Sequence, residues 1–322
     1  MLLALAASRR VLFVSGKGGV GKTTVASAVA LARARAGARV LVVSTDPAHS
    51  LGHVWERTIG DRPVRLVTRF EGCVDGLEID PQRTVDRHLA AVGATMRRLL
   101  PERLAPHADR HLRLARDAPG THESAVLERI AEAVETGLGA YDLVVFDTAP
   151  SGHTLHLMAL PEQLTSWTEA LLVNRDRSER FGAALRGLGG SAGDDDADAE
   201  LRRVLLRRQR RFALLRAVLT DPEQASFALV LTAERLAVVE TLELHRQLTD
   251  LGLTVGALVV NRRSPDDAGE LLAARRDQED RHVADVRERL VEVPLQEVPM
   301  VPGDLVGEAA LARLESVLGA AG

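Results

Sequence analysis

A glycine-rich loop between a strand pattern and a helix pattern constrains the fold of this chain more than any other feature. The loop, Gly16-Lys-Gly-Gly-Val-Gly-Lys-Thr23, follows the apolar run Val11–Ser15 and precedes the helical pattern Thr23–Ala36. Repeated glycines let backbone N–H groups gather around an anion, and the start of the following helix favours negative charge. The pattern therefore predicts a phosphate-binding loop at the carboxyl end of a strand in an α/β fold.

Lysine usage singles out the same loop. The chain has 41 lysine and arginine residues, and its only two lysines are Lys17 and Lys22. An ammonium is a compact point charge on a thin side chain, whereas a guanidinium is a broad planar group that fits poorly into a tight backbone cradle. Because arginine is used everywhere else, the retention of lysine at these two positions indicates that the loop binds phosphate.

Residues of the loop have distinct expected roles. We expect Lys22 to reach the β- and γ-phosphates and the Thr23 hydroxyl to bind Mg²⁺. Asp147 ends the apolar run Leu143–Asp147 and is expected to act as a second anchor for the metal. The expected cofactors are therefore ATP and Mg²⁺. The loop residues expected to surround the nucleotide are Gly16, Lys17, Gly18, Gly19, Val20, Gly21, Lys22, Thr23 and Thr24.

A dinucleotide-binding fold is the main alternative reading of the loop. The same letters fit Gly-x-Gly-x-x-Gly, and Asp46 ends the next strand pattern, as that fold requires. However, Lys22 and Thr23 follow the last glycine, and phosphoryl transfer needs them whereas hydride transfer does not. No acid or base suited to a hydride-transfer site stands out in the sequence, so we favour the phosphate-binding loop.

Short apolar segments alternate with longer helical patterns along the chain. The helical patterns Thr23–Ala36 and Glu234–Leu251 lie between apolar, β-branched runs, which is typical of a doubly wound, mostly parallel α/β sheet with its ligand site at the carboxyl ends of the strands. The predicted strands are Val11–Ser15, Arg39–Ser44, Asp142–Asp147, Phe227–Thr232 and Val255–Asn261, with weaker candidates at Cys73–Ile79 and Glu292–Val298.

Two long helix-prone stretches interrupt this alternation. Residues 81–136 and 160–220 are expected to form a helical subdomain inserted into a single P-loop ATPase domain of residues 1–322, with a flexible loop at 187–199. The first residues are expected to lead directly into the first strand.

The segment 201–216 within the second stretch contains seven arginines and permits two interpretations. We favour a core-facing helix with a solvated basic face over a surface for a client or a membrane. An imperfect apolar stripe runs through this segment and just beyond it, and consists of Leu201, Val204, Leu205, Phe212, Leu215 and Leu219.

Charge and composition exclude several classes of protein. A formal net charge of −4 argues against a nucleic-acid-binding protein that relies on bulk charge. The single cysteine, Cys73, excludes a disulfide framework and cannot alone build a thiolate metal site. No apolar run approaches the roughly 18 to 20 residues that span a bilayer. We therefore expect a soluble, cytoplasmic protein with no integral membrane segment and no nucleic-acid partner.

Further motifs resemble those of the arsenite-pump and tail-anchored-protein-targeting ATPases. Ser44-Thr-Asp-Pro-Ala-His-Ser-Leu51 is similar to the first switch of that family, and Asp147-Thr-Ala-Pro-Ser-Gly-His-Thr-Leu155 to the second. Lys17 matches the extra lysine of the family's variant phosphate loop. With supporting matches as far as Pro299, the resemblance covers nearly the whole chain.

This resemblance implies a homodimer that hydrolyses ATP, with roles for five residues. Asp46 would orient the attacking water, and Lys17 would reach the phosphates of the partner subunit. Gly152 would offer its backbone N–H to the γ-phosphate. Asn261 would contact adenine, and Glu234 would approach nucleotide from the partner subunit.

The chain also departs from the family pattern. No cysteine pair follows Asn261, so a dimer closed by zinc is not expected, and Cys73 alone cannot supply the three thiolates that bind arsenite in pump members. The chain has only four methionines, whereas targeting members carry a methionine-rich groove.

The function that we predict is a switch ATPase that couples opening and closing of a homodimer to a protein client. Hydrophobic tail-anchored membrane proteins are the candidate clients. One alternative is an arsenite-stimulated ATPase subunit of an arsenic efflux pump. Another is a nucleotide switch of the partition or positioning type, which is disfavoured because Leu305–Leu318 lacks the basic face of a membrane-targeting helix.

Overall fold

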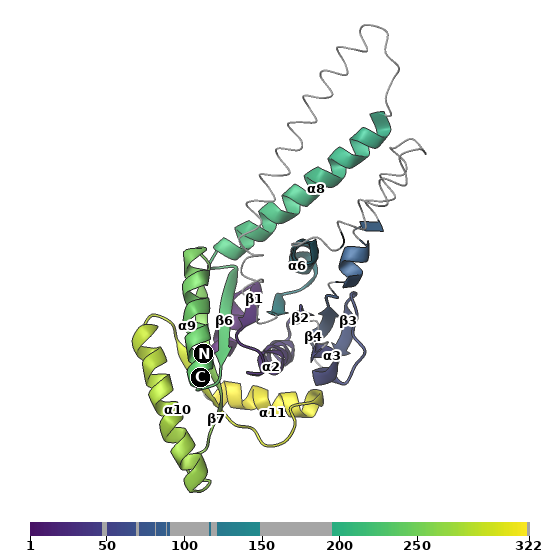
Figure 1. Ribbon diagram of the computed structural model, residues 1–322. Coiled ribbons are helices and arrows are strands. Elements are labelled where there is room, and N and C mark those ends of the chain that lie inside the picture. Colours follow the sequence, from purple (N-terminus) through teal and green to yellow (C-terminus); the bar gives the residue numbers. More distant parts are fainter. Residues whose placement is uncertain are drawn as a thin grey trace, which may run out of the picture. The chain divides into compact units, whose positions relative to one another are not determined.

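The computed structural model describes residues 1–46, 50–68, 71–80, 82–87, 89–90, 116, 121–148 and 195–320 (Figure 1). The chain divides into two compact units. The first comprises Met1–Asp80, Ala133–Leu155 and Val218–Gly322, and the second comprises Pro81–Glu132 and His156–Ala217. The helical subdomain expected from the sequence was 81–136 with 160–220.

A mostly parallel sheet forms the centre of the first unit, as the sequence predicts. The order of its eight strands is β3-β4-β2-β5-β1-β6-β7-β8, and only the edge strand β3 is antiparallel to its neighbour. The strands are β1 (Val11–Ser15), β2 (Arg39–Ser44), β3 (Val64–Val67), β4 (Cys73–Glu78), β5 (Leu143–Asp147), β6 (Ala225–Leu231), β7 (Val255–Arg263) and β8 (Leu295–Pro299).

Helices pack against both faces of the sheet (Figure 1). α2 contacts α11, α1 and β2, whereas α9 contacts β6, β7 and α10. The described helices named here are α1 (Leu2–Ser8), α2 (Lys22–Arg35), α3 (Ser50–Trp55), α6 (Thr121–Ala140), α8 (Asp195–Thr220), α9 (Arg235–Asp250), α10 (Glu270–Arg289) and α11 (Gly307–Ala320).

Strand β1 is buried on both faces, which fixes the glycine-rich loop at the centre of the sheet. Leu12 and Val14 belong to the core that includes residues of α2 and α11. Because side chains alternate along a strand, Phe13 faces the other way, where its ring stacks on Phe146 at 4.7 Å and on Phe227 at 4.8 Å between centroids.

The amino-terminal residues form α1, a helix that was not predicted and that ends shortly before β1. Leu2 is fully buried, and its backbone N–H donates to the Gln296 side chain at 2.9 Å. The same Gln296 side chain donates to the carbonyl of Leu318 at 2.7 Å. An apolar segment that buries one face against α2 and α11 is stable as a helix through this packing, which local sequence does not reveal.

The bounds predicted for the flexible loop need one correction. Residues 195–199, assigned to the flexible loop, begin α8. Their sequence, Asp195-Asp-Ala-Asp-Ala199, is acidic, and acidic residues are favourable at the start of a helix because of its dipole. The remainder of that loop lies outside the described residues. β3 and α10 were not predicted.

The carboxyl-terminal half of α8 bears out the favoured reading of its apolar stripe. Phe212, Leu215 and Leu219 are buried, whereas Arg207 and Arg216 are exposed. The side chains of Leu201, Val204 and Leu205 lie outside the described set. Within the described part of the chain, no helix combines the length and the apolar character that crossing a membrane requires.

Candidate functional site

The glycine-rich loop has backbone angles that only glycine adopts readily. Gly16, Gly19 and Gly21 have φ values of +143°, +82° and +93°. A Cβ atom on Gly16 would lie 2.0 Å from the carbonyl oxygen of Val230, and one on Gly21 would lie 2.5 Å from Nδ2 of Asn261. The loop is therefore held close to β6 and to the end of β7, with no room for a side chain at Gly16 or Gly21.

Lys22 begins α2 and folds back over the loop. Its Nζ donates to the carbonyl oxygen of Lys17 at 3.0 Å, and the residue is buried. Burial lowers the pKa of Lys22, and the nearby carboxylates of Asp147 and Asp46 act in the opposite direction. A partly desolvated ammonium at a helix start, beside a glycine-rich loop, is suited to binding a polyphosphate.

Thr23 and Asp147, predicted to anchor a metal, lie side by side. The Thr23 hydroxyl donates to Oδ2 of Asp147 at 2.7 Å, and Ser44 Oγ lies 3.4 Å from the same oxygen. Only 1% of Asp147 is exposed. Burial raises the pKa of Asp147 to about 6, although the Thr23 hydrogen bond and the charge of Lys22 lower it.

Ser50, on α3, connects this pair to Asp46. Its Oγ lies 3.1 Å from Thr23 Oγ1 and 3.1 Å from Oδ2 of Asp46. The contacts Asp147–Thr23, Thr23–Ser50 and Ser50–Asp46 require three hydrogens, but the two hydroxyls supply only two when both carboxylates are ionised. The Thr23–Ser50 contact therefore has no hydrogen of its own, and a cation bound to these oxygens would offset the shortage.

The chemistry of these donors fits Mg²⁺. Magnesium prefers hard oxygen ligands and takes few of them from the protein, with water and phosphate oxygens completing its shell. The Thr23 hydroxyl and the Asp147 carboxylate would hold it, and the raised pKa of Asp147 makes metal binding compete with a proton.

The side chain of Lys17 points away from the glycine-rich loop to which it belongs. Its Nζ lies 3.5 Å from Oε1 of Glu240 on α9, and both side chains are partly exposed. Asn261, at the carboxyl end of β7, is 3% exposed, and its Nδ2 donates to the carbonyl oxygen of Val20 at 2.8 Å. The structure thus brings Asn261 to the phosphate loop, while Lys17 points toward α9.

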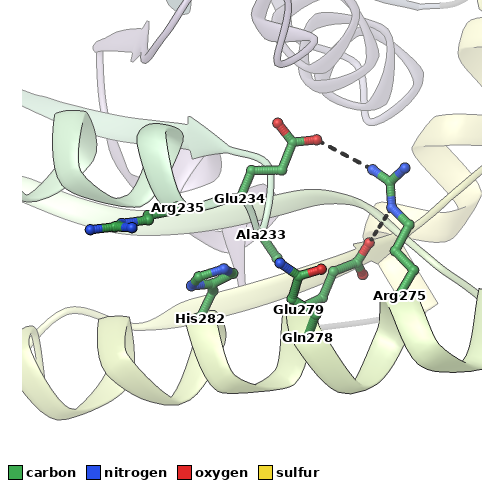
Figure 2. A pocket seen from close by; sticks show the side chains of 7 residues that line it. All are labelled: Ala233, Glu234, Arg235, Arg275, Gln278, Glu279 and His282. Carbon is green, nitrogen blue, oxygen red and sulfur yellow. Dashed lines mark hydrogen bonds and ion pairs between the residues drawn. The ribbon is translucent and has the colours of Figure 1, made fainter.

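Glu234 is the residue that precedes the first turn of α9. It pairs with Arg275 at 3.3 Å, and Arg275 also contacts Glu279 at 3.1 Å (Figure 2). These residues line a cavity of about 240 Å³ together with Ala233, Arg235, Gln278 and His282. Gly152 lies outside the described residues.

Sequence reasoning assigned no role to Ser44, Ser50 or Arg262, all of which contact predicted site residues. Ser50 follows Asp46 by four residues in the switch motif, which is the signal that could have identified it. Arg262 follows Asn261, and its Nη1 donates to the carbonyl oxygen of Gly19 at 2.9 Å. Its contact depends on a turn that the sequence does not reveal.

Comparison with known proteins places these observations in context. The family model described as anion-transporting ATPase matches residues 9–320. An arsenical pump-driving ATPase of Acidiphilium multivorum is 33% identical over 308 residues, which cover 94% of this chain and 48% of that protein. The chain therefore spans about half the length of this relative.

Two other relatives are similar along nearly their whole length. The putative arsenical pump-driving ATPase 2 of Aquifex aeolicus is 28% identical, over 96% of this chain and 99% of that protein. The ATPase get3 of Schizosaccharomyces japonicus is also 28% identical, over 95% of this chain and 91% of that protein.

Replacing Asp147 by asparagine should stabilise the protein at alkaline pH when nucleotide and metal are absent. The pKa of Asp147 is about 6 in the folded chain against an ordinary value of 3.8, so ionisation of this group opposes folding. The penalty is absent below about pH 4, grows as the pH rises through 6, and is on the order of 3 kcal/mol above pH 7. Urea unfolding of the wild type and of Asp147→Asn from pH 4 to pH 8, with a chelator present, measures this difference in the free energy of unfolding.

The exposed Asp250, replaced by asparagine, is the matched control for this series. Its free energy of unfolding should track that of the wild type across the pH range. A stability difference between Asp147→Asn and wild type that does not change with pH would contradict the raised pKa.

Proposed function

The chain belongs to the anion-transporting ATPase family, and we propose that it binds ATP with Mg²⁺ at the loop between β1 and α2 and hydrolyses it. One observation carries the proposal. Lys22, Thr23, Asp147 and Asp46 converge at the carboxyl ends of β1, β2 and β5. Thr23 contacts Asp147 directly and is connected to Asp46 through Ser50. Three segments distant in sequence thus supply one polyphosphate and metal site.

The catalytic contribution of this chain is positional and electrostatic. Backbone N–H groups of the loop and the Lys22 ammonium hold the β- and γ-phosphates, and Mg²⁺ bound to Thr23 and Asp147 would neutralise their charge. Asp46 is held by Ser50 and by a hydrogen bond from its own N–H to Ser44 Oγ at 3.2 Å. A carboxylate fixed in this way orients a water for attack on the γ-phosphate.

The proposed active form is a homodimer that closes over nucleotide. Lys17 is partly exposed, and its ion pair with Glu240 is a surface pair, which contributes about 0 to 1 kcal/mol. A triphosphate of the partner subunit carries several negative charges and outcompetes one solvated carboxylate. Nucleotide binding is thereby coupled to closure, and Glu234 and Gly152 are proposed to complete the site from the partner and from the second switch.

We propose that this motion acts on a protein client, and hydrophobic tail-anchored membrane proteins are the candidate clients. The proposed location of the chain is the cytoplasm. The arsenite-stimulated alternative is disfavoured because Cys73 is the only cysteine and is buried in β4. The positioning-type switch is disfavoured because α11 buries Leu311, Leu314 and Leu318.

Two substitutions separate nucleotide binding from hydrolysis. Lys22→Ala should weaken ATP binding by about 100-fold, since it removes a charge-assisted contact to phosphate. Asp46→Asn should bind ATP normally but lower kcat by about 10² to 10³, because a neutral amide replaces the carboxylate that orients and polarises the attacking water. Calorimetric titration and a phosphate-release assay measure the two effects, with Asp250→Asn as control. Equal ATPase rates for Asp46→Asn and wild type would refute the role of Asp46.

Closure is tested with Lys17→Ala in the hydrolysis-deficient Asp46→Asn background. Dimer formation with ATP should be lost, because no ammonium crosses to the partner, while ATP affinity of the single chain changes by less than about fivefold. Analytical ultracentrifugation with and without ATP gives the readout. ATP-dependent dimers of the double variant as stable as those of Asp46→Asn would show that Lys17 is not required.

Arsenite should leave the ATPase rate unchanged. A soft metalloid needs several thiolates, and a single buried thiol cannot hold it. Phosphate release measured across an arsenite titration, with Cys73→Ser as control, tests this. Strong stimulation would favour the efflux-pump alternative over the protein client.

A further inference from the structure

We infer that Asn261 and Arg262 are positioning residues that hold the phosphate loop in its anion-binding shape, and that the buried Arg263 anchors them. The inference rests on the proposed function, because it concerns how the same loop is kept ready for phosphate. It gives Asn261 a role other than the adenine contact that the family resemblance suggests.

The two side chains contact consecutive carbonyl groups of the loop. Asn261 Nδ2 donates to the oxygen of Val20 at 2.8 Å, and Arg262 Nη1 donates to that of Gly19 at 2.9 Å. The missing side chain of Gly21 makes room for the amide, since a Cβ there would lie 2.5 Å from Asn261 Nδ2. The turn after β7 therefore lies directly against the loop.

Holding these carbonyls orients the groups that bind phosphate. In a planar trans peptide the C=O and the following N–H point in opposite directions. Fixing the Gly19 oxygen therefore fixes the N–H of Val20, and fixing the Val20 oxygen fixes the N–H of Gly21. With both carbonyls held by donors, neither peptide can rotate to present an oxygen to an anion.

The backbone of the turn is itself unusual. Arg262 has φ +58°, in the left-handed region that long side chains rarely adopt. Its N–H donates to Asn261 Oδ1 at 3.0 Å. The pairing of β7 with β8 is irregular between Val260 and Arg263, so the turn departs from the regular ladder. Such a conformation persists only where surrounding contacts impose it.

Arg263 supplies those contacts from within the protein. Its side chain is 1% exposed, and it pairs with Glu279 at 2.7 Å, with Glu297 at 2.7 Å and also with Asp280. The backbone N–H and the hydroxyl of Ser264 both donate to Glu279. The residue that follows Arg262 is thus fixed to α10 and β8, and Figure 2 shows how Arg275 extends the cluster to Glu234.

Both polar atoms of the Asn261 amide are already hydrogen-bonded within the chain. Its nitrogen donates to the carbonyl oxygen of Val20, and its oxygen accepts from the N–H of Arg262. If its role is to hold the loop, its loss weakens binding of any polyphosphate. If its role is to read adenine, its loss weakens only ligands that carry that base.

The test measures displacement of a fluorescent ATP analogue by ATP, GTP and inorganic tripolyphosphate in the presence of Mg²⁺. Asn261→Ala and Arg262→Ala should weaken all three ligands by a common factor of about three to ten, the effect of losing one hydrogen bond. KM for ATP should rise by the same factor while kcat changes little, since Asp46 is untouched. Arg262→Lys should recover part of the affinity, because an ammonium can donate to the same carbonyl.

Arg262→Gly separates the side chain from the backbone. Glycine adopts the left-handed conformation freely, so this variant should be at least as stable as Arg262→Ala and yet bind as weakly. The matched control is Arg289→Ala, an exposed arginine of α10. Thermal unfolding of every variant identifies any that fail to fold.

Three outcomes would overturn the inference. They are wild-type affinity in folded Asn261→Ala and Arg262→Ala, a loss confined to ATP, or full recovery of affinity in Arg262→Gly. Failure of the wild type to bind any of the three ligands is a different result, because it would refute the proposed function itself.

Discussion

The hydrogen bond from Thr23 to Asp147 is the interaction on which the site depends. It joins the first turn of α2 to the end of β5 across 2.7 Å, with the carboxylate fully buried. The register of the sheet makes it possible, because Asp147 pairs with Val14 of β1 and with Ser44 of β2. The carboxyl ends of β1, β2 and β5 therefore lie side by side, next to the glycine-rich loop.

Two lysines of the same loop occupy contrasting environments. Lys22 is buried against the loop and close to two carboxylates, whereas Lys17 is partly exposed and paired with Glu240. Under the proposed function, the inner ammonium would bind the nucleotide of its own subunit, and the outer one would bind that of a second copy of the chain. These two roles would explain why arginine has replaced neither lysine.

The central strands and the site that they carry could be predicted from the sequence, because both depend on local patterns. The bounds of β1 and β2 agree with the predicted runs to the residue, since strands buried on both faces are continuous apolar segments. Thr23, Asp147 and Asp46 were expected at one edge of the sheet and lie there. Parallel topology alone is sufficient to bring strand ends together.

Features fixed by tertiary contacts could not be predicted. α1 is helical because Leu2 and Ala6 are buried against distant elements, and β3 exists only through pairing with β4. α10 buries only Glu279, Val283 and Val286, and its glutamate is stabilised by Arg263, a partner that no periodicity reveals. The contacts of Ser50 and Arg262 could not be predicted for the same reason, because they depend on loops that are distant in sequence and adjacent in the fold. Gly152 lies outside the described residues.

The most direct test of the account is a calorimetric titration of the wild-type chain with a non-hydrolysable ATP analogue at pH 6, in buffers of different ionisation enthalpy, with Mg²⁺ and with a chelator. We predict one nucleotide per chain, affinity that falls when Mg²⁺ is removed, and release of a fraction of a proton as the metal takes the place of the proton on Asp147. No binding, or binding that neither needs Mg²⁺ nor releases a proton, would contradict a magnesium–nucleotide site built on Thr23 and Asp147.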